Sequence, residues 1–269
     1  MITYNVIING IEVAAAYRED TVQGLFLPLL RRLSSLQREK GRRILVMLAA
    51  PPGAGKSTLL SFLNRLSRER EGLHPIQTIG MDGFHRRQEY LLRHDTERDG
   101  RRVSLVEIKG APVTFDLERL RESIRKAAAG EKTGWPVYDR LLHNPVEDAI
   151  RLEGDILLLE GNYLLLDEEG WRGLREYADY TISVTADEEL LRKRLIARRM
   201  KTGVAEDDAV RFVDFSDMPN VRLCLEKTLP ADLQLTLDVD GDYHPGAGGT
   251  LNLNETRDQR NGQKEGEAG

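Results

Sequence analysis

A glycine-rich stretch in the first quarter of the chain has the residue types that bind phosphate. It lies between two apolar runs, residues 44–48 and 59–63, which are predicted to form a strand and a helix. In that context backbone N–H groups point inward and hold a phosphate at the positive end of the helix. The residues predicted to do so are Gly53, Ala54, Gly55, Lys56, Ser57 and Thr58.

Two side chains of this phosphate loop (residues 53–58) have further predicted roles. Lys56 can reach the β- and γ-phosphates of a nucleotide, and the Ser57 hydroxyl can ligate Mg²⁺. Ala50 stands where the pattern G-x-x-x-x-G-K-[ST] has its first glycine. Alanine tolerates positive φ less well than glycine, so the chain must turn differently at the start of the loop. A plain Gly/Pro turn is the alternative interpretation.

Two acids follow predicted strands and can face this loop. Asp82 comes after a strand over residues 76–79, and Glu160 ends an apolar strand that begins at residue 155. In an open parallel sheet, ligands gather at the carboxyl ends of the strands. Asp82 can accept a proton from a substrate hydroxyl or help to hold Mg²⁺, and Glu160 is expected to meet Mg²⁺ directly or through water. A turn aspartate and a solvated strand-end glutamate are the alternatives.

A basic helix is predicted over residues 187–200, where Arg194 and Arg198 lie four residues apart on one face. Such arginines can clamp a transferring phosphoryl group, and a solvated charged face is the alternative. Residues 135–143 bring aromatic, acidic and basic groups together, which suits a site for a small polar metabolite. The basic stretch over residues 86–102 is predicted to be a solvated helix and loop.

Strands and helices alternate between residues 41 and 240, which predicts a main domain with a parallel sheet covered by helices on both faces. Asp116 is a predicted helix cap, and Asp167 is the candidate cap of a helix that reaches residue 177. The pattern also predicts helices over residues 117–129, 205–215 and 221–227 and strands over residues 180–184 and 233–239.

Residues 1–40 precede the first core strand and are predicted to form an N-terminal extension. An Asn-Gly pair at positions 9–10, between β-prone runs, predicts a hairpin with a two-residue type I′ turn. Asp20 can cap a helix over residues 21–40, which Pro28 is expected to kink or split. The hairpin can add to a sheet edge or mediate dimerisation, so a homodimer is one expected arrangement.

The composition limits the classes of function. The chain is 40% hydrophobic, enough for a substantial core, but its apolar runs are shorter than the roughly 18 residues of a membrane span. A net charge of −5 argues against a nucleic-acid-binding surface. The lone Cys224 excludes an intrachain disulfide, and there is no basic N-terminal signal, which together suit the cytoplasm. Residues 241–269 are predicted to form a disordered polar tail.

In this order the motifs resemble the pantothenate kinase, uridine kinase and phosphoribulokinase superfamily, over roughly residues 40–240. The resemblance rests on the phosphate loop, the basic helix and the runs at residues 82–84, 110–116, 136–139 and 160–161. It is nearest to a bacterial branch described as nucleoside or nucleotide kinases and fructose transport kinases. It implies a P-loop NTPase three-layer sandwich with a mostly parallel sheet, a small helical lid and an N-terminal β-hairpin plus helix extension.

The resemblance implies ATP- and Mg²⁺-dependent phosphorylation of a hydroxyl group on a small metabolite. Asp82 matches the family's catalytic base, and Glu160 matches its strand-end acid. Arg194 and Arg198 match its lid arginines, which act with Lys56 on the transferring phosphoryl group.

Candidate acceptor contacts also follow from the resemblance. Tyr138 and His143 have the five-residue spacing of two substrate contacts in uridine kinases. Arg140 and Asn220 lie where pantothenate kinases contact their substrate. Gly110 stands where uridine kinases have an aspartate that binds the ribose hydroxyls, whereas pantothenate kinases have glycine there too. Sugars, nucleosides and pantothenate-like compounds therefore all stay open as acceptors.

A nucleotide-dependent switch or chaperone NTPase without a metabolite acceptor is the alternative from another class. Residues 167–170 fit a D-x-x-G switch motif, but the chain contains no Asn-Lys-x-Asp motif for reading guanine. A catalytically idle nucleotide-binding module is a third interpretation, which the presence of Lys56, Asp82 and Glu160 disfavours.

Overall fold

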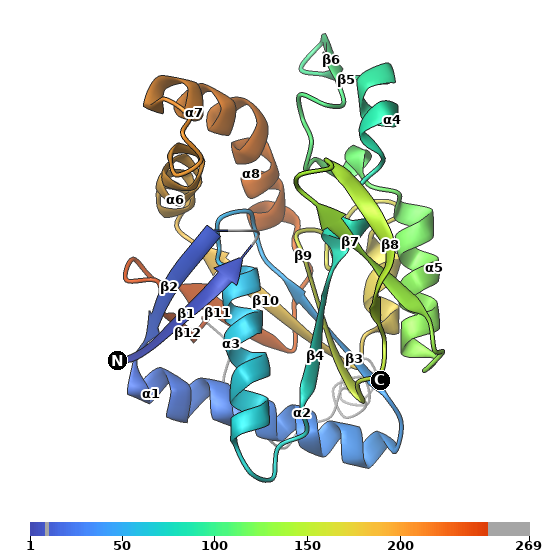
Figure 1. Ribbon diagram of the computed structural model, residues 1–269, viewed down its shortest axis with the longest axis vertical. Coiled ribbons are helices and arrows are strands. Elements are labelled where there is room, and N and C mark those ends of the chain that lie inside the picture. Colours follow the sequence, from blue (N-terminus) through green and yellow to red (C-terminus); the bar gives the residue numbers. More distant parts are fainter. Residues whose placement is uncertain (9–10, 247–269) are drawn as a thin grey trace, which may run out of the picture.

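A six-stranded sheet runs through the centre of the molecule, with helices on both of its faces (Figure 1). The computed structural model describes residues 1–8 and 11–246. The strands lie in the order β12 (Tyr243–Pro245), β11 (Leu233–Leu237), β10 (Tyr180–Ala186), β3 (Ile44–Ala49), β9 (Ile156–Gly161) and β4 (Ile76–Gly80). Neighbouring strands are parallel except β11 and β12. This arrangement confirms the mostly parallel α/β sheet predicted from the sequence.

The central strand β3 shows why the sheet is covered on both faces. All six of its residues are buried. Leu48 belongs to a hydrophobic cluster that includes α2 (Leu27–Lys40) and α3 (Lys56–Glu69), whereas Met47 belongs to a second cluster that includes α5 (Leu117–Ala128). Successive side chains of a strand point to opposite faces, so a strand that is apolar at every position must be covered twice.

The N-terminal extension forms the predicted hairpin. β1 (Ile2–Ile8) and β2 (Ile11–Tyr17) pair antiparallel in a sheet of their own, and the predicted turn type at positions 9–10 lies outside the described residues. The Tyr4 hydroxyl lies 2.7 Å from the hydroxyl of Ser61 on α3. The hairpin is therefore packed on the helix that follows the phosphate loop and is not added to the edge of the central sheet.

The helix of the extension is continuous but changes its winding before Pro28. It begins as α1 (Glu19–Thr21), continues as a π-helical segment (Val22–Phe26) and ends as α2. Asp20 lies in its first turn and does not cap it. Proline has no N–H to donate to the carbonyl four residues earlier, so the regular series of helical hydrogen bonds is interrupted at this residue. The helix is therefore widened locally before Pro28 and is not split there.

Two projections extend from the same end of the molecule (Figure 1). One contains the lid helices α6 (Glu188–Met200) and α7 (Glu206–Phe212), which lead through a π-helical segment (Val213–Asp217) into α8 (Met218–Lys227). The other contains α4 (Gln88–Arg93), β5 (Asp95–Arg98) and β6 (Arg101–Ser104), so the predicted helix and loop is a helix and a hairpin. The Arg98 guanidinium lies 5.6 Å from the ring centroid of Phe215, which connects the two projections.

A second hairpin follows α5 and consists of β7 (Gly134–Asp139) and β8 (Asn144–Arg151). Short 3₁₀ segments are η2 (Met81–Phe84), η3 (Pro112–Thr114) and η4 (Arg172–Tyr177). The predicted cap at Asp116 is confirmed, because its carboxylate accepts the N–H of Arg119 at 3.2 Å. The predicted cap at Asp167 is wrong: this residue forms an ion pair with Arg172, and only the 3₁₀ segment η4 follows.

The sheet continues past the predicted boundary at residue 240. The strand β12 lies at its edge, and Asp242 and Tyr243 are 1% and 3% exposed. The prediction of a disordered tail is therefore wrong for residues 241–246, because a few buried side chains place this polar run in the sheet. Residues 247–269 lie outside the described part of the chain.

Candidate active site

The phosphate loop lies between β3 and α3, as the sequence predicts. Gly53 and Gly55 have φ values of 84° and 81°, in the left-handed region that favours glycine. Gly55 is the N-cap of the 14-residue helix α3, so backbone N–H groups of the first turn have no partner within the helix and can bind an anion. Ala50 donates its N–H to the carbonyl of Gly161 at 3.3 Å without a left-handed φ, so this position needs no glycine.

The two functional side chains of the loop meet residues at the end of β9. The Lys56 ammonium donates to Asn162 Oδ1 at 2.6 Å, and Ser57 Oγ donates to Glu160 Oε1 at 2.7 Å. Burial lowers the pKa of Lys56, and the carboxylates of Glu160 and Asp82 act against that shift. Burial raises the pKa of Glu160, and Lys56 and Ser57 act against it. The loop therefore contacts the strand-end acid that the sequence singled out.

The hydroxyl of Ser57 and the carboxylate of Glu160 are oxygen ligands of the kind that Mg²⁺ prefers. Over residues 1–8 and 11–246, no group of three or more His, Cys, Asp or Glu side chains is arranged to hold a metal ion. Mg²⁺ usually keeps several waters and shares the phosphates of a substrate, so two protein oxygens beside a phosphate loop are sufficient. The donor set therefore fits the metal that the motif implies.

Asp82 follows β4 directly, in the 3₁₀ segment η2, and its side chain is exposed. The strands β4 and β9 are parallel neighbours, so their ends place Asp82 and Glu160 on the same edge of the sheet. The charge of Asp82 acts on the pKa of Lys56 and of Arg198, in each case against the effect of burial. The predicted base thus lies within electrostatic reach of both the loop lysine and the lid.

The two lid arginines differ in what they contact. Arg194 Nε donates to the carbonyl of Gly53 at 2.9 Å, so α6 touches the phosphate loop directly. Arg198 lies one turn further along the same helix. Burial lowers its pKa, and Asp217 and Asp82 act against that shift. Arg194 therefore contacts the phosphate loop directly, whereas Arg198 is related to the site through the charges of Asp82 and Asp217.

The predicted acceptor residues are brought together only in part. Tyr138 is half-buried, and its ring centroid lies 5.4 Å from that of His85. Arg140 is exposed in the turn after β7, and its charge acts on Tyr138. His143 is exposed in the same turn. Its backbone carbonyl accepts a hydrogen bond from Lys109, which also contacts Tyr138.

Asn220 differs from the other predicted acceptor residues because it is buried in α8. Its side chain is engaged within that helix, where Nδ2 donates to the carbonyl of Ser216 at 3.0 Å. A side-chain carbon added at Gly110 would lie 3.8 Å from the same nitrogen. Asn220 therefore borders the loop that carries Gly110 and is not part of the group around Tyr138.

Gly110 has a φ of 108°, which strains any residue with a side chain. Its carbonyl accepts a hydrogen bond from the hydroxyl of Tyr163 at 2.6 Å, which fixes the path of this loop. An aspartate like that of uridine kinases is therefore disfavoured here by backbone conformation. The glycine is a requirement of this loop and not a neutral replacement.

Sequence reasoning missed three residues of the site. Lys109 contacts Tyr138 and precedes the glycine of the 110–116 run, which was the only signal for it. His85 is buried and stacks on Phe115 with centroids 3.9 Å apart, and its Nδ1 has no hydrogen-bond partner. The third residue, Tyr243, was assigned to the polar tail.

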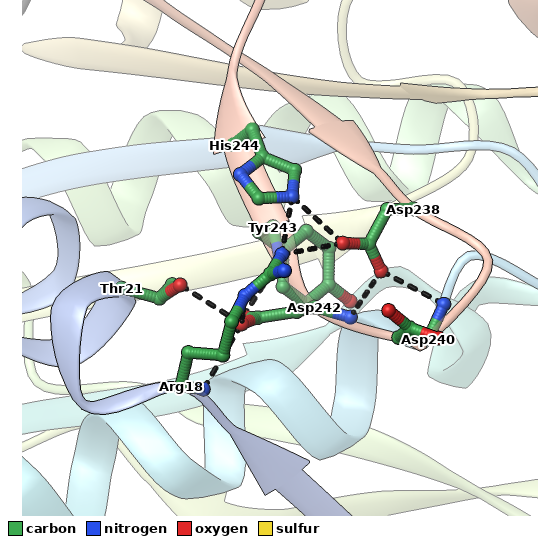
Figure 2. Close-up of polar contacts among 7 residues, drawn as sticks. All are labelled: Arg18, Thr21, Asp238, Asp240, Asp242, Tyr243 and His244. Carbon is green, nitrogen blue, oxygen red and sulfur yellow. Dashed lines mark hydrogen bonds and ion pairs between the residues drawn. The ribbon is translucent and has the colours of Figure 1, made fainter. Parts of the chain in front are cut away.

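Tyr243 connects the C-terminal strand to the phosphate loop. Its hydroxyl donates to the carbonyl of Ala54 at 2.7 Å. Figure 2 shows how its neighbour Asp242 is held: Oδ2 accepts from Arg18 N, Arg18 Nε and Thr21 Oγ1, each at 2.9 Å. The N-terminal extension therefore fixes the strand whose tyrosine supports the loop.

No helix among the described residues combines the length and the hydropathy that crossing a bilayer requires.

Known proteins with related sequences or structures span most of the chain. The "Uncharacterized protein YggC" of Escherichia coli (strain K12) is 39% identical over 238 residues, which are 88% of this chain and 96% of that protein. The "Putative uridine kinase C227.14" of Schizosaccharomyces pombe is 32% identical over 200 residues, which are 72% of this chain and 83% of that protein. A scan against protein-family models found no match.

A solved structure is also similar to this chain in both sequence and fold. The crystal structure of a "putative fructose transport system kinase" from Silicibacter sp. TM1040 has a TM-score of 0.68 at 32% sequence identity, covering 80% of this chain and 98% of its own. Relatives above 30% identity that span more than two thirds of the chain establish the family. The chain belongs to the superfamily of P-loop kinases that contains the pantothenate kinases, uridine kinases and phosphoribulokinases.

Proposed function

We propose that this protein is an ATP- and Mg²⁺-dependent kinase that transfers the γ-phosphoryl group of ATP to a hydroxyl group of a small metabolite. One observation supports the proposal most strongly. The lid residue Arg194 donates to the phosphate loop at 2.9 Å, and the parallel neighbours β4 and β9 place Asp82 and Glu160 at the sheet edge that carries this loop. A site that only bound a nucleotide would need the loop and the metal-binding acid, but it would not need a second carboxylate and a lid cation at the same point.

The phosphate loop and the lid bind and orient the nucleotide. Backbone N–H groups at the start of α3 hold the phosphates, and Lys56 reaches the β- and γ-phosphates. Arg194 is already held on the loop through the carbonyl of Gly53, so its guanidinium is positioned beside the phosphates. Positive groups fixed around the transferring phosphoryl stabilise the charge that develops in the transition state without reorganising.

Ser57 and Glu160 would hold Mg²⁺, which when bound neutralises phosphate charge.

Asp82 acts as the proton acceptor. Its exposed carboxylate stands at the end of β4, on the edge that carries the phosphate loop, where a bound metabolite can present a hydroxyl group. Removing the hydroxyl proton as the phosphoryl group arrives increases the nucleophilicity of the oxygen. The lid helices exclude water from this edge, which limits transfer of the phosphoryl group to water.

The proposed compartment is the cytoplasm. Cys224 is 2% exposed, and burial raises the pKa of its thiol to about 12. The thiol is therefore protonated and unreactive, as expected of a cysteine that packs as a small apolar side chain in a reducing compartment.

The test is an ATP-consumption screen of the purified protein over a library of hydroxylated metabolites. One compound or one chemical class should stimulate ADP formation, and mass spectrometry should show its phosphorylated product. The Asp82→Asn variant should bind ATP but lose this stimulation.

Two results would contradict the proposal. Near-normal turnover by Asp82→Asn would remove the assigned base. GTP binding far tighter than ATP binding, with no metabolite phosphorylated, would favour the switch or chaperone NTPase.

A further inference from the structure

The acceptor side of the site carries two cations without a carboxylate partner. We define this side by Asp82, His85, Lys109, Tyr138 and Arg140. We propose that the phosphoryl acceptor carries an anionic group, a carboxylate or a phosphate ester, and that Arg140 and Lys109 form the subsite that binds it. The inference rests on the proposed function, because it names the class of compound that the kinase phosphorylates.

Lys109 lies between three elements and meets only neutral oxygen atoms. Its ammonium donates to Gln88 Oε1 of α4 at 2.9 Å and to the carbonyl of His143, in the turn between β7 and β8, at 3.3 Å. It also donates to the hydroxyl of Tyr138, whose ring centroid lies 4.6 Å from Nζ. These hydrogen bonds fix the ammonium in place, but none of them neutralises its charge.

Arg140 adds a second positive charge in the segment that Lys109 contacts, since it lies between Tyr138 and His143, which both accept a hydrogen bond from the Lys109 ammonium. Burial lowers the pKa of Lys109, and the charge of Arg140 lowers it further. In the described part of the chain, no ion pair joins either residue to a carboxylate. By contrast, Arg42 and Arg192 each donate two hydrogen bonds to a single carboxylate. The two cations on the acceptor side are thus unlike these paired arginines.

The acid nearest in sequence is already engaged. Asp139 Oδ1 accepts the N–H groups of Leu141 and Leu142 at 2.8 and 2.9 Å, so it shapes the turn. A second positive charge near the partly buried Lys109 ammonium is unfavourable unless a negative charge offsets it. A guanidinium without a partner is also the group best suited to bind a carboxylate or phosphate with two parallel hydrogen bonds.

Tyr138 completes the subsite as a donor. Its oxygen accepts from Lys109, so its own O–H proton can be donated to the metabolite. Burial raises the pKa of Tyr138, which keeps that proton in place at neutral pH. His85 adds no charge there, because burial lowers its pKa, Lys109 and Arg140 lower it further, and only Asp82 and the backbone at Thr114 oppose this shift.

The charge distribution orients such an acceptor. Its anionic group is attracted by Arg140 and Lys109 and repelled by the carboxylate of Asp82. The hydroxyl end is therefore the end presented to Asp82 and the phosphate loop.

The experiment compares pairs of acceptors that differ only in the anion. Suitable pairs are ribose and ribose 5-phosphate, glycerol and glycerol 3-phosphate, and glucitol and gluconate. ADP formation and product mass are measured for each member with the wild-type protein. The anionic member of at least one pair should have a kcat/KM about 10–100-fold above its neutral partner, the range expected for hydrogen bonds between charged groups. Phosphate and carboxylate pairs distinguish the two sources of charge.

For each variant, the ratio of kcat/KM for the anionic member of a pair to kcat/KM for its neutral partner is compared with the wild-type ratio. Arg140→Gln and Lys109→Met should each lower that ratio about 10-fold or more, mainly through the KM of the anionic member, and Lys109→Arg should retain most of it. Arg140 is exposed, so its replacement leaves the fold intact. Lys132→Met, at an exposed lysine before β7, is the matched control and should keep the wild-type ratio.

The outcomes separate the inference from the proposed function. If the neutral members are phosphorylated as well as or better than the anionic ones, or if both variants lower the two members equally, the anionic subsite is wrong and the kinase assignment stands. If no compound of either kind stimulates ADP formation, the proposed function fails, and the inference fails with it.

Discussion

The nucleotide side and the acceptor side of the site differ in the charges that act on their lysines. On the nucleotide side, Lys56 and Arg194 donate to neutral oxygens of Asn162 and Gly53, at 2.6 and 2.9 Å, and the carboxylates of Glu160 and Asp82 act against the effect of burial on the pKa of Lys56. On the acceptor side, Lys109 also donates to neutral oxygens, but the charge that acts on it is the positive charge of Arg140, which lowers its pKa together with burial. In the described part of the chain, no ion pair joins Arg140 to a carboxylate. The chain itself supplies carboxylates near the lysine of the phosphate loop, whereas on the proposed acceptor side it places two cations near each other without an ion pair among the described residues.

The difference shows which part of the site is set by the fold and which by the ligand. A phosphate loop is held by strand, helix and backbone conformation, so its geometry is the same whatever metabolite is phosphorylated. Asp82 and His85 follow the sheet strand β4, but the rest of the acceptor side is assembled from α4, the 105–116 run and the β7–β8 hairpin, none of which belongs to the central sheet. Such peripheral segments can change without disturbing the core, and specificity is therefore expected to reside there.

The largest expected effects are on kcat and ATP binding, and they come from replacing one residue on each side that acts on the reacting groups. Asp82→Asn should lower kcat about 10²–10⁴-fold, because a general base is lost, while ATP binding is retained. Lys56→Met should weaken ATP binding as well as turnover, because the lysine contacts phosphate before and during transfer. Isothermal titration with ATP and steady-state kinetics measure both quantities. If Asp82→Asn weakened ATP binding as much as Lys56→Met does, the division of the site would be incorrect.

The nucleotide side was largely predictable from the sequence because its signals are local. Gly53 to Thr58 are consecutive, and Asp82 and Glu160 each end a strand, where topology alone brings them to one edge. The sheet followed from the alternation of apolar runs.

The rest of the site depends on contacts that no local pattern records. Tyr243 and Ala54 are 189 residues apart in the chain, and a polar run with one aromatic residue gives no strand signal. Lys109 acquires its role only when Gln88, Tyr138 and His143 fold around it. Pro28 signalled an irregularity in the helix, but no local pattern specified the π-helical segment that precedes it.

The second prediction concerns the attachment of the C-terminal strand to the nucleotide side. Asp242→Ala removes a buried carboxylate that accepts hydrogen bonds from Arg18, Thr21 and the backbone N–H of Tyr243. The free energy of unfolding should fall by about 2–4 kcal/mol, the sum of several hydrogen bonds of about 0.5–1.5 kcal/mol each. Denaturant unfolding measures this value. Asp240→Ala, at an exposed aspartate in the same loop, is the control, and an equal loss there would show that Asp242 has no special role.

The third prediction compares two buried tyrosines, one on each side. Tyr243→Phe removes the hydrogen bond to Ala54 and should raise the Kd for ATP about 3–10-fold, with little change in the acceptor KM. Tyr163→Phe removes the hydrogen bond to Gly110 and should raise the acceptor KM by a similar factor, with little change in the Kd for ATP. Measuring both constants for both variants tests the division directly, and the same pattern in the two variants would contradict it.

The smallest expected effect is a pH dependence that belongs to the acceptor side. Burial lowers the pKa of His85 from 6.5, and although Asp82 opposes the shift, Lys109 and Arg140 reinforce it. The unfolded chain therefore binds this proton more readily, so stability is lost as the pH falls below about 6.5. His85→Phe, which keeps a ring stacked on Phe115, should lessen the loss of unfolding free energy between about pH 7 and pH 5.

The control for that measurement is His74→Gln, which replaces a histidine outside the site. Wild-type, His85→Phe and His74→Gln proteins are unfolded by denaturant across the pH range, and the slopes are compared. The sign is decisive, because a histidine stabilised by a nearby carboxylate would give the opposite slope and lose stability as the pH rises. A wild-type slope that is unchanged by His85→Phe would mean that burial, with the smaller effects of Lys109 and Arg140, does not lower the pKa of this ring in the folded protein.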